Sequence, residues 1–170
     1  MARNIEIKAR VSDLPLVRVK VGSLASTPPE VFLQTDTFFV VPRGRFKLRQ
    51  VSEGAGELIF YQRSDRAGPK ESSYVRSACT DAKTVSAVLA RALGVRGVVE
   101  KRREVFMIGR SRIHLDEVHG LGTFLEIEVV LADGEAAVEG ERVARELMAA
   151  FGIPESALVA CAYIDLLEEP

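Results

Sequence analysis

Apolar and polar residues alternate along much of this chain, and the alternation begins in its first segment. In residues 4–10 (NIEIKAR), Ile5, Ile7 and Ala9 are interleaved with polar or charged residues. Successive side chains of a β-strand point to opposite faces, so this pattern predicts a strand with one apolar and one charged face. Taken alone, the segment is typical of a half-buried strand whose polar face is solvated.

Further segments share the strand-like composition and are separated by turn residues. These predicted strands cover residues 31–41, 45–51, 57–63, 71–79, 98–108, 112–118 and 123–131. Because many of the connections are short, we expect mainly antiparallel pairing. Apolar residues at helical spacing, preceded by capping residues, predict helices elsewhere. These helices cover residues 12–22, 81–93 and 133–151, with a final helix within 156–167.

The charged residues of five predicted strands recur at alternate positions, so those of each strand share one face. The groups are Glu6, Lys8 and Arg10; Arg45, Lys47 and Arg49; Lys101 and Arg103; Arg112 and Asp116; Glu126 and Glu128. Arg63 and Lys70 come from a sixth strand and the loop that follows it. The opposite faces are mostly aliphatic, so the predicted helices are expected to cover those faces.

Two interpretations of the charged faces are open. An open sheet could leave them in water, which is the ordinary explanation for any single strand. Alternatively, the faces converge. Glu126 and Glu128 would lie about 7 Å apart on one strand and, with Glu6, could hold Mg²⁺ or Mn²⁺. Many convergent arginines and lysines would then require several anionic oxygens, and a polyphosphate with bound metal supplies both partners. A closed barrel presents such an interior without an exposed edge.

Composition narrows the class of protein. The 170 residues, 47% of them hydrophobic, fit a single globular domain spanning residues 1–170. With 23 basic and 24 acidic residues the net charge is −1, which argues against bulk attraction to nucleic acid or to anionic membranes. Cys79 and Cys161 are expected to be free thiols. No segment suggests a signal peptide or a membrane span, so we expect a cytoplasmic protein.

The order of these motifs resembles the CYTH superfamily, which contains class IV adenylyl cyclases, thiamine triphosphatases and inorganic triphosphatases. The matching segments are 6–8 (EIK), 34–39 (QTDTFF), 47–49 (KLR), 68–70 (GPK), 101–103 (KRR), 115–118 (LDEV), 124–128 (FLEIE) and 163–167 (YIDLL). Each segment is a weak signal alone, but together they extend from end to end of the chain. The resemblance implies an α+β fold, an eight-stranded antiparallel β-barrel (a triphosphate tunnel) with helices packed outside.

The resemblance also implies roles for individual residues. The implied substrate-binding residues are Lys8, Lys47, Arg49, Arg63, Lys70, Lys101 and Arg103, and the implied metal ligands are Glu6, Glu126 and Glu128, with Mg²⁺ or Mn²⁺. The implied catalytic residues are Glu6, Lys8 and Asp116. Asn4 stands where the family signature has its first glutamate, and an amide keeps an oxygen ligand but removes one charge.

The implied function is a metal-dependent enzyme acting on ATP, thiamine triphosphate or tripolyphosphate. Cyclisation of ATP to cyclic AMP and hydrolysis of a triphosphate both need the same phosphate-binding residues, so the sequence does not separate them. A non-catalytic module that binds nucleotides or polyphosphate is the alternative. An RNA-binding barrel is disfavoured by the charge balance and by the lack of aromatic residues within basic segments. A homodimer is implied by the resemblance alone.

Overall fold

The computed structural model describes residues 2–51 and 54–168, and it contains a closed β-barrel of eight antiparallel strands. Around the barrel the strand order is β1-β5-β4-β3-β2-β6-β7-β8, and β8 returns to pair with β1. In sequence order the strands β1 to β8 are Ala2–Arg10, Glu30–Phe39, Arg45–Gln50, Gly56–Arg63, Lys70–Cys79, Val95–Ile108, Ser111–Val118 and Gly122–Val130. The predicted α+β fold with an eight-stranded antiparallel barrel is confirmed.

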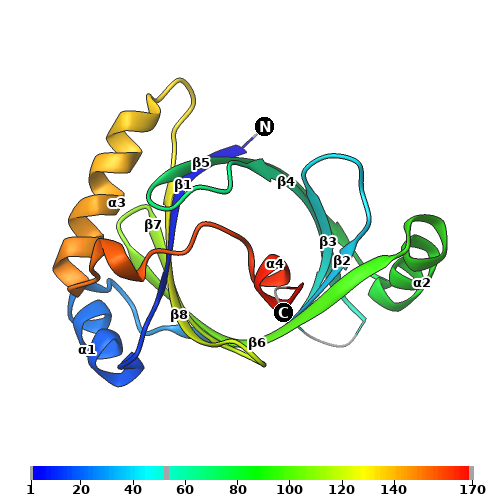
Figure 1. The fold of residues 1–170 in the computed structure, drawn as a ribbon, viewed down its shortest axis with the longest axis horizontal. Coiled ribbons are helices and arrows are strands. Elements are labelled where there is room, and N and C mark those ends of the chain that lie inside the picture. Colours follow the sequence, from blue (N-terminus) through cyan, green and yellow to red (C-terminus); the bar gives the residue numbers. More distant parts are fainter. Residues whose placement is uncertain (1, 52–53, 169–170) are drawn as a thin grey trace.

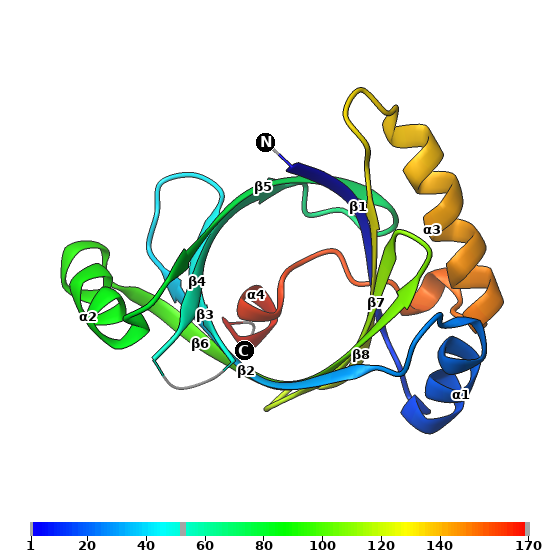
Figure 2. The ribbon, with the colours of Figure 1, turned by 180° about the vertical axis from the view of Figure 1, so that it is seen from behind.

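Three helices cover the outside of this barrel. In Figure 1, α1 (Leu14–Leu24) and α3 (Ala137–Phe151) lie on one side of the ring, and α2 (Ala82–Leu93) lies on the opposite side. The same grouping is visible from behind in Figure 2. The Asp13 carboxylate caps α1 by accepting a hydrogen bond from the backbone N–H of Leu16. Asp81 caps α2 in the same way. Both caps satisfy N–H groups that have no partner within the helix.

The main hydrophobic core lies between the barrel wall and helices α1 and α3. Ile5 and Ile7 of β1 point outward from the barrel and are completely buried, together with Ile127 of β8. A smaller cluster beneath α2 contains Phe39 and Leu48. The apolar faces predicted from alternation are therefore the outer faces of the strands, and the charged faces are left for the interior.

The C-terminal part of the chain differs from the prediction. Helix α3 begins at Ala137 rather than near residue 133. The expected helix within 156–167 is divided into a short 3₁₀ turn (Glu155–Ala157) and α4 (Tyr163–Glu168), with non-helical residues between them. This non-helical segment lets the chain turn inward, and α4 lies within the outline of the ring in Figure 1. Ile164 and Tyr163 pack there against Phe38, Val99 and Phe124 of the barrel.

Both cysteines are free thiols, as expected. Among the described residues, no helix has the length and hydropathy needed to cross a membrane.

The contact between α3 and the barrel gives a first stability prediction. A Cβ atom at Gly140 would lie 2.6 Å from Cγ1 of Ile5 and 2.7 Å from Cδ2 of Leu131. We expect Gly140→Val to lower the free energy of unfolding by about 1–3 kcal/mol, because overpacking forces the helix away from the sheet. Urea denaturation followed by circular dichroism measures this change.

The matched control is Gly22, the other helical position at which a side chain can be added. A Cβ atom at Gly22 in α1 would meet nothing within 4 Å. Gly22→Ala is therefore expected to stabilise the protein by about 0.5–1 kcal/mol, because alanine loses less backbone entropy in a helix. Equal effects of the two substitutions would contradict the close packing of α3 on β1.

Candidate active site

A charged cavity occupies the interior of the barrel. Its volume is about 120 Å³, and each of the eight strands contributes side chains to its lining. The basic lining residues are Lys8, Lys47, Arg49, Arg63, Arg76, Lys101, Arg103 and Arg112, and the acidic ones are Glu6, Asp36, Glu126 and Glu128. Eight basic groups thus face four acidic groups, although the whole chain has a net charge of −1. This local excess of positive charge suits a polyanion.

Pairing between neighbouring strands explains how distant residues meet. Glu6 of β1 lies opposite Glu128 of β8, and Lys8 lies opposite Glu126. On the other side of β8, Glu126 lies opposite His114 of β7. Because side chains in register on antiparallel strands project to the same face, these groups all point into the barrel.

One basic wall is formed by β3 and β6, with an acidic residue of β2 between them. The carboxylate of Asp36 accepts hydrogen bonds from Lys47 at 2.7 Å and from Arg49 at 2.9 and 3.1 Å. The Lys101 ammonium group lies 3.8 Å from the same carboxylate. Asp36 is 1% exposed, so its carboxylate is shielded from solvent, whereas the Arg49 side chain is 23% exposed. The predicted substrate-binding residues Lys47, Arg49 and Lys101 are therefore brought together.

Arg103 connects this wall with the acidic side of the barrel. Its guanidinium group bonds both carboxylate oxygens of Asp116, at 2.7 and 2.5 Å, and also bonds Glu126 at 2.5 Å. Burial alone would lower the pKa of Arg103, but the charges of Asp116 and Glu126 outweigh burial and raise it well above its usual range. Arg103 is therefore charged throughout the accessible pH range.

The ligating atoms of His114, Glu126 and Glu128 all lie within 4.8 Å of one another. Although burial opposes ionisation, the charge that His114 carries when protonated at low pH and the charge of Arg112 hold the pKa of Glu128 at about 2. Burial lowers the pKa of His114 below its ordinary value, so the imidazole is neutral at pH 7. Two ionised carboxylates and a neutral imidazole are suitable donors for a divalent cation, and the residues present therefore fit a metal ion.

Glu6 and Asn4 lie beside this group. Glu6 forms an ion pair with Arg63, and burial raises the pKa of its carboxyl group. The side-chain oxygen of Asn4 is buried and has no hydrogen-bond partner among the described residues. Asn4 lines the cavity, so this oxygen is a further acceptor for a ligand. The roles of Glu6 as a metal ligand and as a catalytic residue stay predictions.

Lys70 was predicted to bind substrate and Asp116 to be catalytic, but both side chains make their contacts with other groups of the protein. The Lys70 ammonium group donates hydrogen bonds to the carbonyl oxygens of Arg66 at 3.0 Å and Ala160 at 2.7 Å, so it anchors the C-terminal segment. Asp116 is completely buried, with Arg103 and Tyr163 bonded to its carboxylate. Direct contact of either residue with a substrate is a prediction that stays open.

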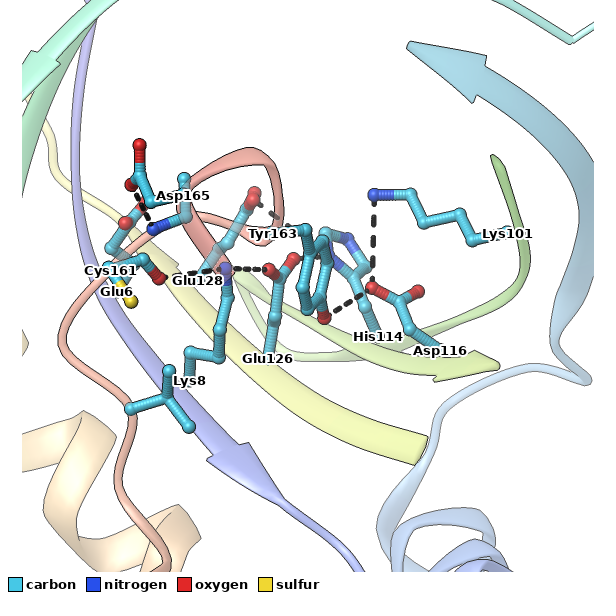
Figure 3. Close-up of polar contacts among 12 residues, drawn as sticks. Glu6, Lys8, Lys101, His114, Asp116, Glu126, Glu128, Cys161, Tyr163 and Asp165 are labelled. Atoms are coloured by element: carbon cyan, nitrogen blue, oxygen red, sulfur yellow. Dashed lines mark hydrogen bonds and ion pairs between the residues drawn. The ribbon is translucent and has the colours of Figure 1, made fainter. Parts of the chain in front are cut away.

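Tyr163 begins the matching segment 163–167, but the resemblance gave it no role in the site. Figure 3 shows its ring between Lys8 and Lys101, with its hydroxyl group directed at Asp116. The hydroxyl donates a hydrogen bond of 2.8 Å to Asp116, and the Lys8 ammonium group lies 3.7 Å from the ring centroid. His114 is a second component that no sequence motif indicated. It lies between Arg112 and Asp116 in β7, so strand alternation places its side chain on the inner face with theirs, and the β7–β8 register brings it opposite Glu126.

We expect Tyr163→Phe to lower the free energy of unfolding by about 1.5–3 kcal/mol, because it removes a buried hydrogen bond to a charged group. Thermal unfolding followed by circular dichroism measures this loss. The aromatic ring beneath Lys8 is retained, so the affinity for tripolyphosphate should change by less than about threefold. A variant as stable as the parent protein would show that the hydroxyl group does not support Asp116.

Comparisons with known proteins agree with this architecture. The family model for the CYTH domain matches residues 2–163. Adenylate cyclase CyaB of Aeromonas hydrophila is 25% identical, over 97% of this chain and 88% of that protein. The structure of PH1012 from Pyrococcus horikoshii has a TM-score of 0.86 at 23% identity, covering 96% of this chain and 98% of that one. HpAC1 of Hippeastrum, with a dominant triphosphatase activity, has a TM-score of 0.66 at 16% identity, covering 97% and 95%. With a charged interior inside the same closed barrel, and a family match across nearly its whole length, this chain belongs to the CYTH domain family.

Proposed function

We propose that this protein is a metal-dependent enzyme that hydrolyses triphosphates inside the barrel. The observation that carries the proposal is the excess of basic over acidic groups in the cavity of a protein with a net charge of −1. A triphosphate offers several closely spaced anionic oxygens, which match the buried amino and guanidinium groups. The resident carboxylates alone leave these cations only partly compensated.

In this proposal four basic side chains bind the phosphate oxygens and hold the triphosphate extended across the cavity. They are those of Lys47, Arg49, Lys101 and Arg103. Because these groups are fixed by the strands before the substrate arrives, they stabilise developing charge with little reorganisation. Asp116 acts through Arg103, whose guanidinium group it orients.

The metal ion would be held by His114, Glu126 and Glu128, with Glu6 as a further predicted ligand. A bound Mg²⁺ or Mn²⁺ would neutralise charge on the phosphate oxygens. Glu6 is also the candidate to accept a proton from the attacking water, because it lines the cavity and burial raises its pKa above the ordinary value, which makes its carboxylate a stronger base.

Cyclisation of ATP is the second candidate. A neighbouring cavity of about 360 Å³ shares Arg49, Arg103 and Arg112 with the central one, and Phe32 and Val105 give it apolar walls. This cavity has room for a group attached to the triphosphate. The relative from Aeromonas hydrophila carries the name adenylate cyclase.

Incubation with ATP, thiamine triphosphate or tripolyphosphate and Mg²⁺ or Mn²⁺, followed by chromatography of the products, separates the candidates. Orthophosphate released from a triphosphate supports hydrolysis, whereas cyclic AMP with pyrophosphate supports cyclisation. Tight binding of all three compounds without turnover would identify the protein as a non-catalytic polyphosphate-binding module.

A further inference from the structure

Asp36 is an unexpected residue to find in a wall that is proposed to bind phosphate. Its carboxylate lies among three of the proposed phosphate-binding groups, at 2.7 Å from Lys47, 2.9 Å from Arg49 and 3.8 Å from Lys101. The amide of Gln34 donates hydrogen bonds of 3.3 Å to both of its oxygens. A negative charge at this position repels a phosphate, so its presence needs a separate explanation.

The strand arrangement places Asp36 where it can reach two neighbouring strands at once. β2 lies between β3 and β6 in the barrel, and Asp36 is directly opposite Arg49 in the β2–β3 register. Lys47 precedes Arg49 on β3, and Lys101 comes from β6 on the other side. One carboxylate therefore touches cations from both flanking strands.

Asp36 is the carboxylate that pairs with both Lys47 and Arg49, whereas Lys101 also lies 3.9 Å from Asp116. Without Asp36, the mutual repulsion of these three cations would be compensated only on the Lys101 side. Even beside Asp36, burial and the charge of Arg49 lower the pKa of Lys47 to about 7. Burial and the charge of Arg103 lower the pKa of Lys101 to about 8. The cations overcome the effect of burial on Asp36 and hold its pKa well below the ordinary range. Asp36 is therefore ionised over the whole pH range in which Lys47 and Lys101 lose their protons.

We propose that Asp36 is a positioning residue, an internal counterion that keeps Lys47, Arg49 and Lys101 charged and convergent in the empty barrel until a phosphate chain takes over as their partner. This inference rests on the proposed function. It extends that function by proposing that a residue which need not touch the reacting atoms keeps the basic wall charged and correctly arranged for binding phosphate.

The test is metal-free binding of tripolyphosphate to wild-type protein and to Asp36→Asn, measured by calorimetry between pH 5.5 and 9. The ratio of the two dissociation constants at each pH cancels the titration of tripolyphosphate itself. Loss of the carboxylate lowers the pKa of Lys47 and Lys101 further, so at pH 8 the variant should bind at least about tenfold more weakly than wild type. At pH 5.5, where the lysines are protonated in both proteins, the ratio should lie within about threefold.

Two further variants separate positioning from a general structural defect. Adding Lys47→Arg to Asp36→Asn should restore at least about fivefold of the affinity at pH 8, because arginine keeps its proton. Glu100→Gln removes one charge from the exposed outer face of the same wall and should leave the ratio near one at every pH. A ratio for Asp36→Asn that is independent of pH would overturn the inference, even if tripolyphosphate binds and is hydrolysed.

If Asp36→Asn does not fold, carbon-13 NMR of the wild-type protein gives the answer directly. The Asp36 carboxyl carbon should report an ionised group at pH 4, and Lys47 should titrate near pH 7 and become harder to deprotonate when tripolyphosphate binds. A protonated Asp36 at pH 5 would overturn the inference. Absence of tripolyphosphate binding to the wild-type protein at any pH would instead overturn the proposed function, and the inference with it.

Discussion

Arg103→Ala is expected to lower the free energy of unfolding by about 3–5 kcal/mol and to abolish measurable turnover of triphosphates. The substitution leaves two buried carboxylates, Asp116 and Glu126, without the cation that bonds both of them. It also removes a guanidinium group from the cavity that is proposed to hold the substrate. Urea denaturation and steady-state kinetics with tripolyphosphate measure the two effects.

Arg102→Ala is the matched control on the same strand. Its side chain is 40% exposed and points away from the barrel, where it pairs with Glu104 and Glu117. The Glu117 pair is exposed, and the buried carboxylate of Glu104 keeps its hydrogen bonds from Arg18, so the loss of stability should be about 0–1 kcal/mol and turnover should be unaffected. Arg103→Lys separates the effect on folding from the effect on substrate binding. Lysine keeps the positive charge but loses the bidentate hydrogen bonds with Asp116. If Arg103→Lys turns over triphosphates as fast as wild type, the proposed role of this guanidinium group in binding phosphate is contradicted.

Glu128→Gln is expected to weaken Mn²⁺ binding by about 10- to 100-fold and to reduce kcat by about 10²- to 10³-fold. It removes one ionised ligand from the group formed with His114 and Glu126. The fold should survive, because the remaining partner, Arg112, is 28% exposed and can be hydrated. Electron paramagnetic resonance of Mn²⁺ in the absence of triphosphate measures the affinity without any contribution from turnover.

Glu117→Gln is the control for this charge change, because Glu117 is exposed on the outer face of β7. It should leave both Mn²⁺ affinity and kcat unchanged. If Glu128→Gln loses activity but binds Mn²⁺ as tightly as wild type, Glu128 acts on the substrate rather than on a metal ion.

The sequence predicted which side chains share the interior, but it did not predict which of them touch. Strand alternation has a period of two, so the inward residues of β3, β6 and β8 could be identified directly. Contacts such as Glu6 with Arg63, or Arg103 with Glu126, depend on the order and register of strands that are remote in sequence. No local pattern encodes that register, because it is set by how the whole ring closes.

The C-terminal segment was predicted least well, for a different physical reason. Residues 158–162 are neither helical nor paired within a named strand, so their apolar composition carries no period that indicates an orientation. Their position is fixed by Lys8 and Lys70, whose ammonium groups donate to the carbonyl oxygens of Cys161 and Ala160. The predicted helix boundaries there failed because these tertiary contacts compete with local helix formation.

Closure of the ring also has a consequence for how this protein is made. The final ladder joins residues 4–10 to residues 124–130, so about three quarters of the polypeptide must leave the ribosome before the first strand finds that partner. Such high contact order is associated with folding in milliseconds to seconds rather than microseconds. During synthesis the charged inner face of the first strand is therefore exposed to solvent at first, and the enclosed interior of the barrel forms late.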